Sequence, residues 1–355
     1  MFKLRLFTFT LLFLVLIFTC PIKSTANDDF VFPQSHIKKL TSEDIFNTLD
    51  AYRKLNIARN EIFARHGHIF DNKELRKYFL SKKWYKPIKK VSFDQLNSIE
   101  KYNVMLILYF EKYYYKSKLF VDNKYKDEIL FFPADKVVYF DLNNDGKKES
   151  IIYKISNKGF SLQVNNQLTT NELYTNLQKR FAIVDVDKSD NYKEIVIFDE
   201  GPSNDYTSIF YQFFNNKLVK IGEIGGIYRI GLHVYGNGIV EGIIRPHILQ
   251  TWYLKEKYAL KNHEFKPISQ DIYKTNFYVF VKKDIKLHTT RSEKSDYFIL
   301  KEGQIINIIG CDGKKWCFIE TLSGKKGWLL VKDFSYLPDN NIDARDAFEG
   351  LCYAD

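Results

Sequence analysis

Apolar residues recur at helical spacing in the first third of the chain. Leu55, Ala58 and Ile62 fall on one face of a helix, and Gly67 follows as a helix-ending residue. Thr41 and Asp71 each stand three positions before an acidic residue, which is the pattern of a capping box. The pattern therefore predicts a small helical domain at residues 37–120, with a last helix from about 93 to 115.

The period shortens to that of strands after residue 120. Short apolar runs alternate with Asn- and Gly-rich turns, which favours hairpins; the runs are residues 137–140, 151–153, 182–184 and 195–197. Two similar loops begin at Asp141 and Asp185, and a third turn at 236–238 follows about 50 residues later. We expect a central β-domain at 121–276 with blade-like repeats, open or sandwich-like because the segment is too short for a closed propeller.

Short strands with tight turns continue to residue 336. Gly303, Gly313 and Gly324 punctuate them, and Trp328 is expected in the core. This pattern predicts a small C-terminal β-barrel at 277–336, followed by an acidic tail at 337–355. The expected fold class is multidomain: α, then all-β.

The N-terminus has the pattern of a signal peptide. Lys3 and Arg5 precede an apolar run of about thirteen residues, and Ser24 and Ala26 are the small residues expected before a cleavage site. The run is short for a membrane span, although an uncleaved anchor remains an alternative. We expect residues 1–26 to be removed and the protein to be extracellular or associated with the cell envelope.

Charge is unevenly distributed along a chain of net charge +10. Residues 37–120 carry +9, residues 277–336 carry +4, and the segment from 337 carries −4. Basic ends favour anionic wall polymers, peptidoglycan or an anionic membrane surface as partners, and no nucleic acid is expected for an exported protein. Three cysteines follow the leader, an odd number that is not a disulfide framework, although a hairpin would allow Cys311 and Cys317 to pair.

The loop after residue 140 places oxygen ligands at the spacing that calcium prefers. Asp141, Asn143 and Asp145 alternate, the carbonyl of Lys147 stands at the seventh position, and Glu149 stands at the ninth. The second loop gathers four carboxylates within ten residues, which would repel one another without a cation; they are Asp185, Asp187, Asp190 and Glu194. Ca²⁺ is therefore the expected ion, and a solvated acidic turn is the alternative.

Lysines cluster around one aromatic pair of the helical region. They surround Trp84 and Tyr85 and predict a polyanion-binding patch; the patch comprises Lys82, Lys83, Trp84, Lys86, Lys89 and Lys90. A lysine-rich solvated face is the alternative.

Known catalytic signatures are absent from the sequence. It contains no nucleophile-elbow, zinc-protease, P-loop or dinucleotide motif, and no Cys-His arrangement typical of wall peptidases. His66 near a helix end is expected to be structural rather than catalytic. We therefore expect no catalytic residues.

Three segments resemble known modules. The ten residues from Ala58 to Gly67, with Tyr78-Phe79 and the segment 84–87, resemble the YARHG domain, although Phe63 replaces the Tyr of its name. That resemblance implies a helical module of exported bacterial proteins without established chemistry. Residues 287–334, ending in Gly327-Trp328, resemble a bacterial SH3 domain, which implies binding of cell-wall peptides. The first calcium loop resembles those of FG-GAP and VCBS-type β-repeats.

Two functions are compatible with these features. The first is a non-enzymatic envelope protein held at the wall by the SH3-like and basic helical domains, with a calcium-stabilised β-domain between them. The second is a cell-wall-directed hydrolase whose active site has no recognisable motif.

Overall fold

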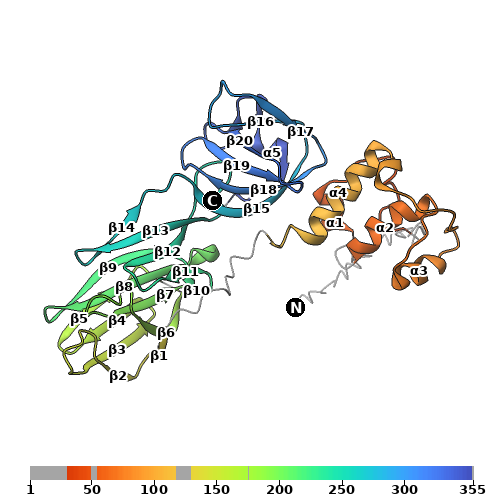
Figure 1. Cartoon of the computed structure of the whole chain (residues 1–355). Coiled ribbons are helices and arrows are strands. Elements are labelled where there is room, and N and C mark those ends of the chain that lie inside the picture. Colours follow the sequence, from red (N-terminus) through yellow and green to blue (C-terminus); the bar gives the residue numbers. More distant parts are fainter. Residues whose placement is uncertain (1–29, 49–53, 117–128, 175, 354–355) are drawn as a thin grey trace, which may run out of the picture.

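The structure, a computed structural model, describes residues 30–48, 54–116, 129–174 and 176–353. A small helical part is followed by a large all-β part, as the hydrophobic pattern predicts (Figure 1). The expected signal peptide lies outside the described residues. Within the described ranges, no helix is both long enough and apolar enough to cross a membrane.

The helical part contains α1 (Ser42–Asn47), α2 (Leu55–Arg65), α3 (Lys73–Leu80) and α4 (Ser98–Lys112), with a 3₁₀ turn at Phe93–Gln95. The capping box between Thr41 and Asp44 is confirmed. In the second box Asn72, one residue later than predicted, caps α3. The single helix expected from 93 to 115 is wrong, because Asn97 accepts the backbone N–H of Glu100 and starts a new helix after the 3₁₀ turn.

Residues 129–268 form three stacked sheets, whose strands are antiparallel except for one short parallel pair in the third sheet. The first contains β2 (Val137–Phe140), β3 (Glu149–Ser156), β4 (Gly159–Val164) and β5 (Gln167–Asn171). The second contains β1 (Leu130–Pro133), β6 (Leu177–Val184), β7 (Glu194–Asp199), β8 (Thr207–Phe214) and β9 (Lys217–Gly225). The third contains β10 (Ile227–Tyr228), β11 (Gly231–Val234), β12 (Ile239–Ile244), β13 (Leu254–Lys261) and β14 (Glu264–Ile268).

The second sheet is buried on both faces. Ile195 and Ile197 of β7 pack with the first sheet, whereas Val196 and Phe198 pack with the third. All six residues of β7 are therefore buried, which explains its unbroken apolar run.

The C-terminal part is a curled seven-stranded sheet. It contains β15 (Tyr273–Val281), β16 (Ile285–His288), β17 (Tyr297–Leu300), β18 (Ile305–Cys311), β19 (Trp316–Thr321), β20 (Lys326–Leu330) and β23 (Phe348–Glu349). The short elements before β23 are β21 (Tyr336–Leu337), β22 (Ile342–Asp343) and α5 (Ala344–Ala347).

Two expectations for this part are wrong. The segment after 336 is no separate acidic tail, because Ala344, Ala347 and Phe348 are buried in the core of the sheet and β23 pairs with β15. Trp328 is not a core residue: it is half-buried and stacks on Phe318, with ring centroids 4.4 Å apart.

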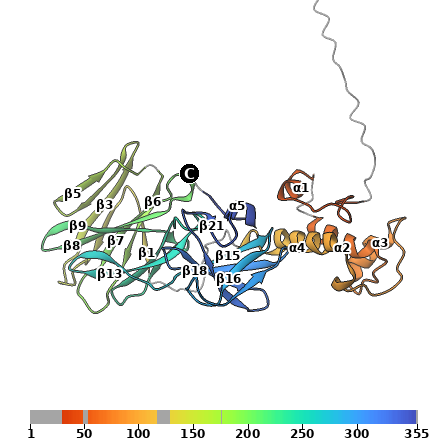
Figure 2. The same cartoon turned by 90° about the horizontal axis from the view of Figure 1, so that it is seen from above.

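The helical part and the C-terminal sheet share one hydrophobic core. Phe280 and Ile305 are buried in the same cluster as the inward-facing residues of α2 and α4. The Tyr102 ring meets that of Phe280 edge-on at 5.1 Å, and the Tyr109 hydroxyl donates to the Tyr278 carbonyl at 3.2 Å. Helix α4 consequently lies against β15, as Figure 2 shows from above.

Candidate functional site: an interdomain cavity, two acidic loops and a basic patch

Arg65, at the end of α2, binds the segment that precedes the first helix. Its guanidinium donates to the carbonyls of Phe32 (3.0 Å) and Pro33 (2.9 Å) and to Glu61 Oε1 (2.7 Å). Glu61 is buried, and its second oxygen accepts the Val31 N–H at 2.8 Å. Burial raises the pKa of Glu61, and the Arg65 charge opposes that shift. The pair therefore anchors residues 31–33 to the helical core.

His66 and Gly67 continue the same network. His66 Nε2 lies 2.8 Å from Oε1 of the buried Glu100, and so connects the end of α2 to the start of α4. Gly67 has φ +73°, and a Cβ there would lie 2.8 Å from the Lys86 carbonyl oxygen. Its own carbonyl accepts the N–H groups of Ile88 and Lys89. Arg65, His66 and Gly67 thus each have a structural role.

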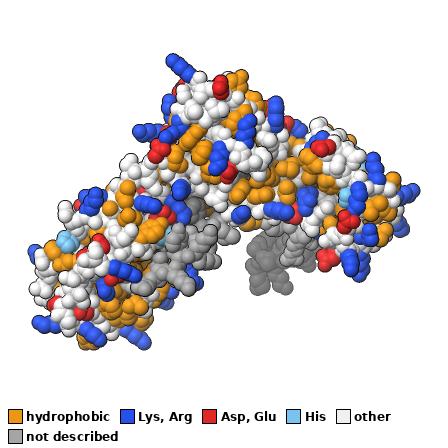
Figure 3. Space-filling model, in the orientation of Figure 1, with side chains coloured by type: hydrophobic (Ala, Val, Ile, Leu, Met, Phe, Trp, Pro, Cys, Tyr) orange, Lys and Arg blue, Asp and Glu red, His pale blue; other side chains and the backbone are white. Residues whose placement is uncertain are grey.

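The predicted lysine patch is divided by its local contacts. Lys90 pairs with Asp71 at 2.5 Å, and Lys82 lies over the Tyr78 ring. Trp84 is half-buried and stacks on Phe30 at 4.7 Å, so its face is not open to a ligand. Of the lysines in the predicted patch, those that are exposed and form no ion pair in the described structure are Lys83, Lys86 and Lys89. Figure 3 shows basic side chains over much of the visible face, including the end formed by α2 and α3.

The first acidic loop has an arrangement that suits a cation. Asp141 Oδ2 accepts the Gly146 N–H at 2.9 Å, while Asp141 Oδ1 is buried without a hydrogen-bond partner. Asp145 Oδ1 accepts the Lys147 N–H at 2.8 Å, and Glu149 Oε2 accepts the Leu142 N–H at 2.9 Å. An unpaired carboxylate oxygen inside a wrapped loop is the feature expected of a hard-cation site.

The second loop differs in its charges. Asp185 Oδ1 is also buried without a partner, but Lys193 Nζ lies 3.3 Å from Asp185 Oδ2. Both oxygens of Glu194 are occupied, by the Val186 N–H and by Gln212 Nε2. Burial raises the pKa of Glu194 to about 8, and the neighbouring Asp190 and Asp185 act in the same direction. A lysine thus already supplies positive charge to this loop.

The remaining predicted ligands are held by their own loops. Asp187 Oδ1 accepts from Ser189, Asp190 Oδ1 accepts the Tyr192 N–H, and Asn143 Oδ1 accepts the Asp145 N–H. Among the described residues, no three His, Cys, Asp or Glu side chains are already grouped as a metal site. In the first loop, the side-chain oxygen of Asn143 and the backbone carbonyl of Lys147 would have to join the carboxylates to complete the ligands of a cation.

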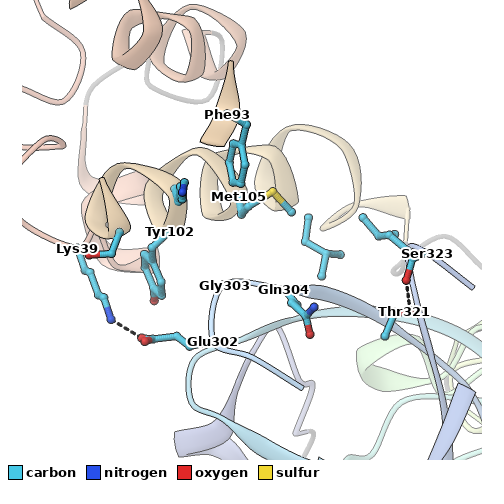
Figure 4. A pocket seen from close by; sticks show the side chains of 13 residues that line it. Lys39, Phe93, Tyr102, Met105, Glu302, Gly303, Gln304, Thr321 and Ser323 are labelled. Carbon is cyan, nitrogen blue, oxygen red and sulfur yellow. Dashed lines mark hydrogen bonds and ion pairs between the residues drawn. The ribbon is translucent and has the colours of Figure 1, made fainter. Parts of the chain in front are cut away.

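A cavity of about 670 Å³ lies where the helical part meets the C-terminal sheet. The helical wall carries Phe93 and Met105, and the opposite wall carries Thr321 and Ser323 (Figure 4). Its other lining residues are Lys39, Ser98, Lys101, Tyr102, Glu302, Gly303, Gln304, Ile305 and Leu322. Both walls are needed, so neither domain forms this cavity alone.

Charge and apolar surface are separated within the cavity. At one end Lys39 Nζ lies 2.5 Å from Glu302 Oε1 and 4.9 Å from the centre of the Tyr102 ring. Burial raises the pKa of Tyr102 to about 12, so its hydroxyl stays protonated and able to donate. Phe93 and Leu322 remain 38% and 48% exposed although they are large apolar residues. The cavity therefore offers apolar faces beside hydroxyl groups and a cation.

A series of hydrogen bonds links a serine, a histidine and an aspartate in the C-terminal part. Ser295 Oγ is 3.3 Å from His288 Nδ1, and His288 Nε2 is 2.8 Å from Asp339 Oδ2. His288 is fully buried, with the Trp316 ring edge-on at 5.3 Å, and Ser295 Oγ also contacts the Asp296 carbonyl. A general base must reach the substrate, so we interpret this series of hydrogen bonds as a structural link between β16 and Asp339.

Comparison with known proteins identifies one module. Residues 30–112 match the YARHG domain, so the chain contains this domain. The match begins before the predicted boundary of 37 and includes residues 31–33, which Arg65 and Glu61 bind. No curated protein and no solved structure matches the chain.

Proposed function

We propose that this protein is an exported, non-enzymatic cell-envelope protein that binds peptidoglycan or an anionic wall polymer, after cleavage of its leader behind Ala26. The observation that carries the proposal is the cavity shared by the YARHG domain and the C-terminal sheet. Its volume lies within the roughly 300–1,000 Å³ typical of ligand sites. Apolar side chains beside hydroxyl groups suit sugar rings or short peptides, and the exposed Lys83, Lys86 and Lys89 would add attraction to a polyanion.

The β-parts are assigned within the same proposal. We assign the curled C-terminal sheet as a bacterial SH3-like module. The hairpins β2–β3, β6–β7 and β11–β12 we assign as related units that carry FG-GAP or VCBS-like loops. In support, Leu142 O accepts the Lys193 N–H at 2.9 Å, and Val186 O accepts the Gly238 N–H at 2.8 Å. In both cases a carbonyl of one loop accepts a backbone N–H from the loop that follows it in the sequence.

We further propose that Ca²⁺ binds the first loop and, more weakly, the second. Bound calcium would neutralise the carboxylates that crowd each loop. In the first loop the unpaired Asp141 Oδ1 is available, whereas in the second Lys193 competes with a metal for Asp185.

The cavity is tested by binding to purified cell walls. Phe93→Ala with Leu322→Ala removes two exposed apolar contacts, so we expect the apparent Kd to rise about tenfold, equivalent to about 1.4 kcal/mol. The matched control is Leu168→Ala with Leu173→Ala, which removes exposed apolar side chains from the first sheet and its border. Equal binding by the cavity variant and the control would contradict the assignment of this site.

The calcium proposal predicts a ligand-dependent melting temperature. Asp141→Ala with Asp145→Ala should remove most of the rise in melting temperature caused by calcium, because both substitutions remove carboxylates from the first loop, which binds calcium more tightly than the second. With a Kd of about 10⁻⁴–10⁻³ M, calcium at 100 times Kd would stabilise the wild type by about 2.7 kcal/mol. Asp94→Ala with Glu172→Ala, two exposed carboxylates elsewhere, is the matched control. If the wild type melts identically in calcium and in chelator, the loops are ordinary turns.

The basic patch predicts salt-dependent binding. Changing Lys83, Lys86 and Lys89 to Gln should weaken binding to anionic walls at low salt several-fold, with little difference at high salt, because exposed charges are screened beyond about 8 Å at physiological ionic strength. A control variant changes three exposed lysines of the central β-part to Gln: Lys154, Lys158 and Lys261. Equal losses in the two variants would mean that net charge, not this patch, governs binding.

A further inference from the structure

Two cysteines face each other across neighbouring strands. Cys311 ends β18 and Cys317 lies in β19, and they are direct register partners in the antiparallel pair. Both are buried, at 3% and 1% exposure, in the main core cluster of the C-terminal sheet. Sharing that cluster places both side chains on the same face of the sheet.

The type of strand pair brings their side chains close. The Asp312 N–H donates to the Trp316 carbonyl at 3.0 Å, so Asp312 and Trp316 are the hydrogen-bonded pair next to the turn. Because pair types alternate, Cys311 and Cys317 form the non-hydrogen-bonded pair, in which Cα atoms lie about 4.5 Å apart. That separation falls at the short end of the roughly 4.4–6.8 Å range of disulfides.

We infer that Cys311 and Cys317 are a redox modification site that closes to a cross-strand disulfide when the protein folds in the presence of a disulfide donor. Such a bond would fasten the turn end of the β18–β19 hairpin. The opposite end of the same hairpin supplies Ile305 and Thr321 to the interdomain cavity.

The thiols have distinct roles in the exchange. Hydrogen bonds from the Cys317 thiol and the Gly313 N–H lower the pKa of Cys311, whereas its bond to Cys311 and burial raise that of Cys317. The Cys311 thiolate attacks one sulfur of a small disulfide such as oxidised glutathione, forming a mixed disulfide and releasing one thiolate. Cys317 then loses its proton and attacks the Cys311 sulfur, which releases the second thiol. The protein is oxidised by two electrons, and one donor disulfide becomes two thiols.

The sequence between the cysteines makes the bond directly observable. Trypsin cleaves after Lys314 and Lys315, so the two cysteines fall in separate peptides, residues 302–314 and 316–325. The full chain is refolded from denaturant with oxidised and reduced glutathione, which gives both thiols access to the donor. It is then alkylated, digested and analysed by mass spectrometry without reduction. We expect the two peptides to be linked and to separate on reduction.

Variants identify the partners of the bond. Cys352→Ser, which removes the third cysteine packed on this cluster, should keep the linked pair, whereas Cys311→Ser and Cys317→Ser should each lose it. The oxidised wild type should melt about 3–6 °C above its reduced form, a shift that Cys352→Ser should retain. Alkylation of both Cys311 and Cys317 in the refolded, oxidised wild type would overturn the inference. So would a bond from either of them to Cys352.

Discussion

Replacing Arg65 by Met will destabilise the helical domain by about 3–5 kcal/mol. Arg65 is the cation paired with Glu61, whose side chain is only 2% exposed. Removing the guanidinium leaves a buried carboxylate without its counter-ion and frees the carbonyls of Phe32 and Pro33. Denaturant unfolding of the full chain, followed by far-ultraviolet circular dichroism, measures the loss.

A matched control lies on the same helix. Arg59 pairs with Glu111, but both side chains are about one-fifth exposed, so Arg59→Met should lose only about 1 kcal/mol or less. Adding Glu61→Gln to Arg65→Met should recover part of the lost stability, because no buried charge then remains unpaired. If Arg65→Met and Arg59→Met are equally stable, Arg65 has no anchoring role, and a ligand-binding role would have to be considered.

Replacing Phe280 by Ala will cost about 3–5 kcal/mol and uncouple two parts of the molecule. Phe280 belongs to the C-terminal sheet, yet it is fully buried in the cluster of the helical domain, 5.1 Å from the Tyr102 ring. Its loss leaves a cavity at the shared core. We expect the helical circular dichroism signal to be lost at a lower temperature than the tyrosine and tryptophan fluorescence of the β-parts. In the wild type the two transition temperatures should lie closer together.

Phe280→Leu provides the graded comparison. It keeps most of the buried volume, so we expect a loss of less than about 1.5 kcal/mol and no separation of the transitions. A Phe280→Ala protein whose helical signal melts as the wild type does would show that the two parts do not depend on each other. The interdomain cavity would then be an accidental gap between independent domains.

Local features were predictable from the sequence because they depend on neighbouring residues. The capping box at Thr41, the turn at Gly67 and the turn at 236–238 all require particular side chains or positive φ at one position, and the structure contains each of them. The β2 strand was placed at its observed bounds for the same reason. Such features are determined by residues that lie only a few positions apart in the sequence.

Features that depend on distant residues were not predictable. The cavity joins Phe93 and Met105 to residues more than 200 positions away, and no local pattern marks either wall. Trp316 and Trp328 lie in neighbouring strands, yet the tertiary structure buries the first and leaves the second half-buried. In the last segment the acidic residues predict an exposed tail, whereas Ala344 and Ala347 between them are buried in the core.

The candidate functional residues show the same contrast between local and tertiary features. The spacing of Asp141 and Asp145 predicts a cation-binding loop, and that loop does contain an unpaired buried carboxylate oxygen. The ion pair between Lys193 and Asp185, at 3.3 Å, distinguishes the second loop from the first, and the sequence pattern does not predict it. Spacing identifies which groups can meet, whereas their partners are fixed by the tertiary structure.

The central claim is that this protein binds the cell wall without cleaving it. The most direct measurement incubates the exported chain with purified cell walls and follows, in the same samples, protein bound to the pellet and soluble muropeptides released. We predict saturable binding that Phe93→Ala with Leu322→Ala weakens, and no muropeptides above the protein-free control. Release of muropeptides by the wild type that Ser295→Ala abolishes would instead show a hydrolase, and absence of wall binding would contradict the proposed function altogether.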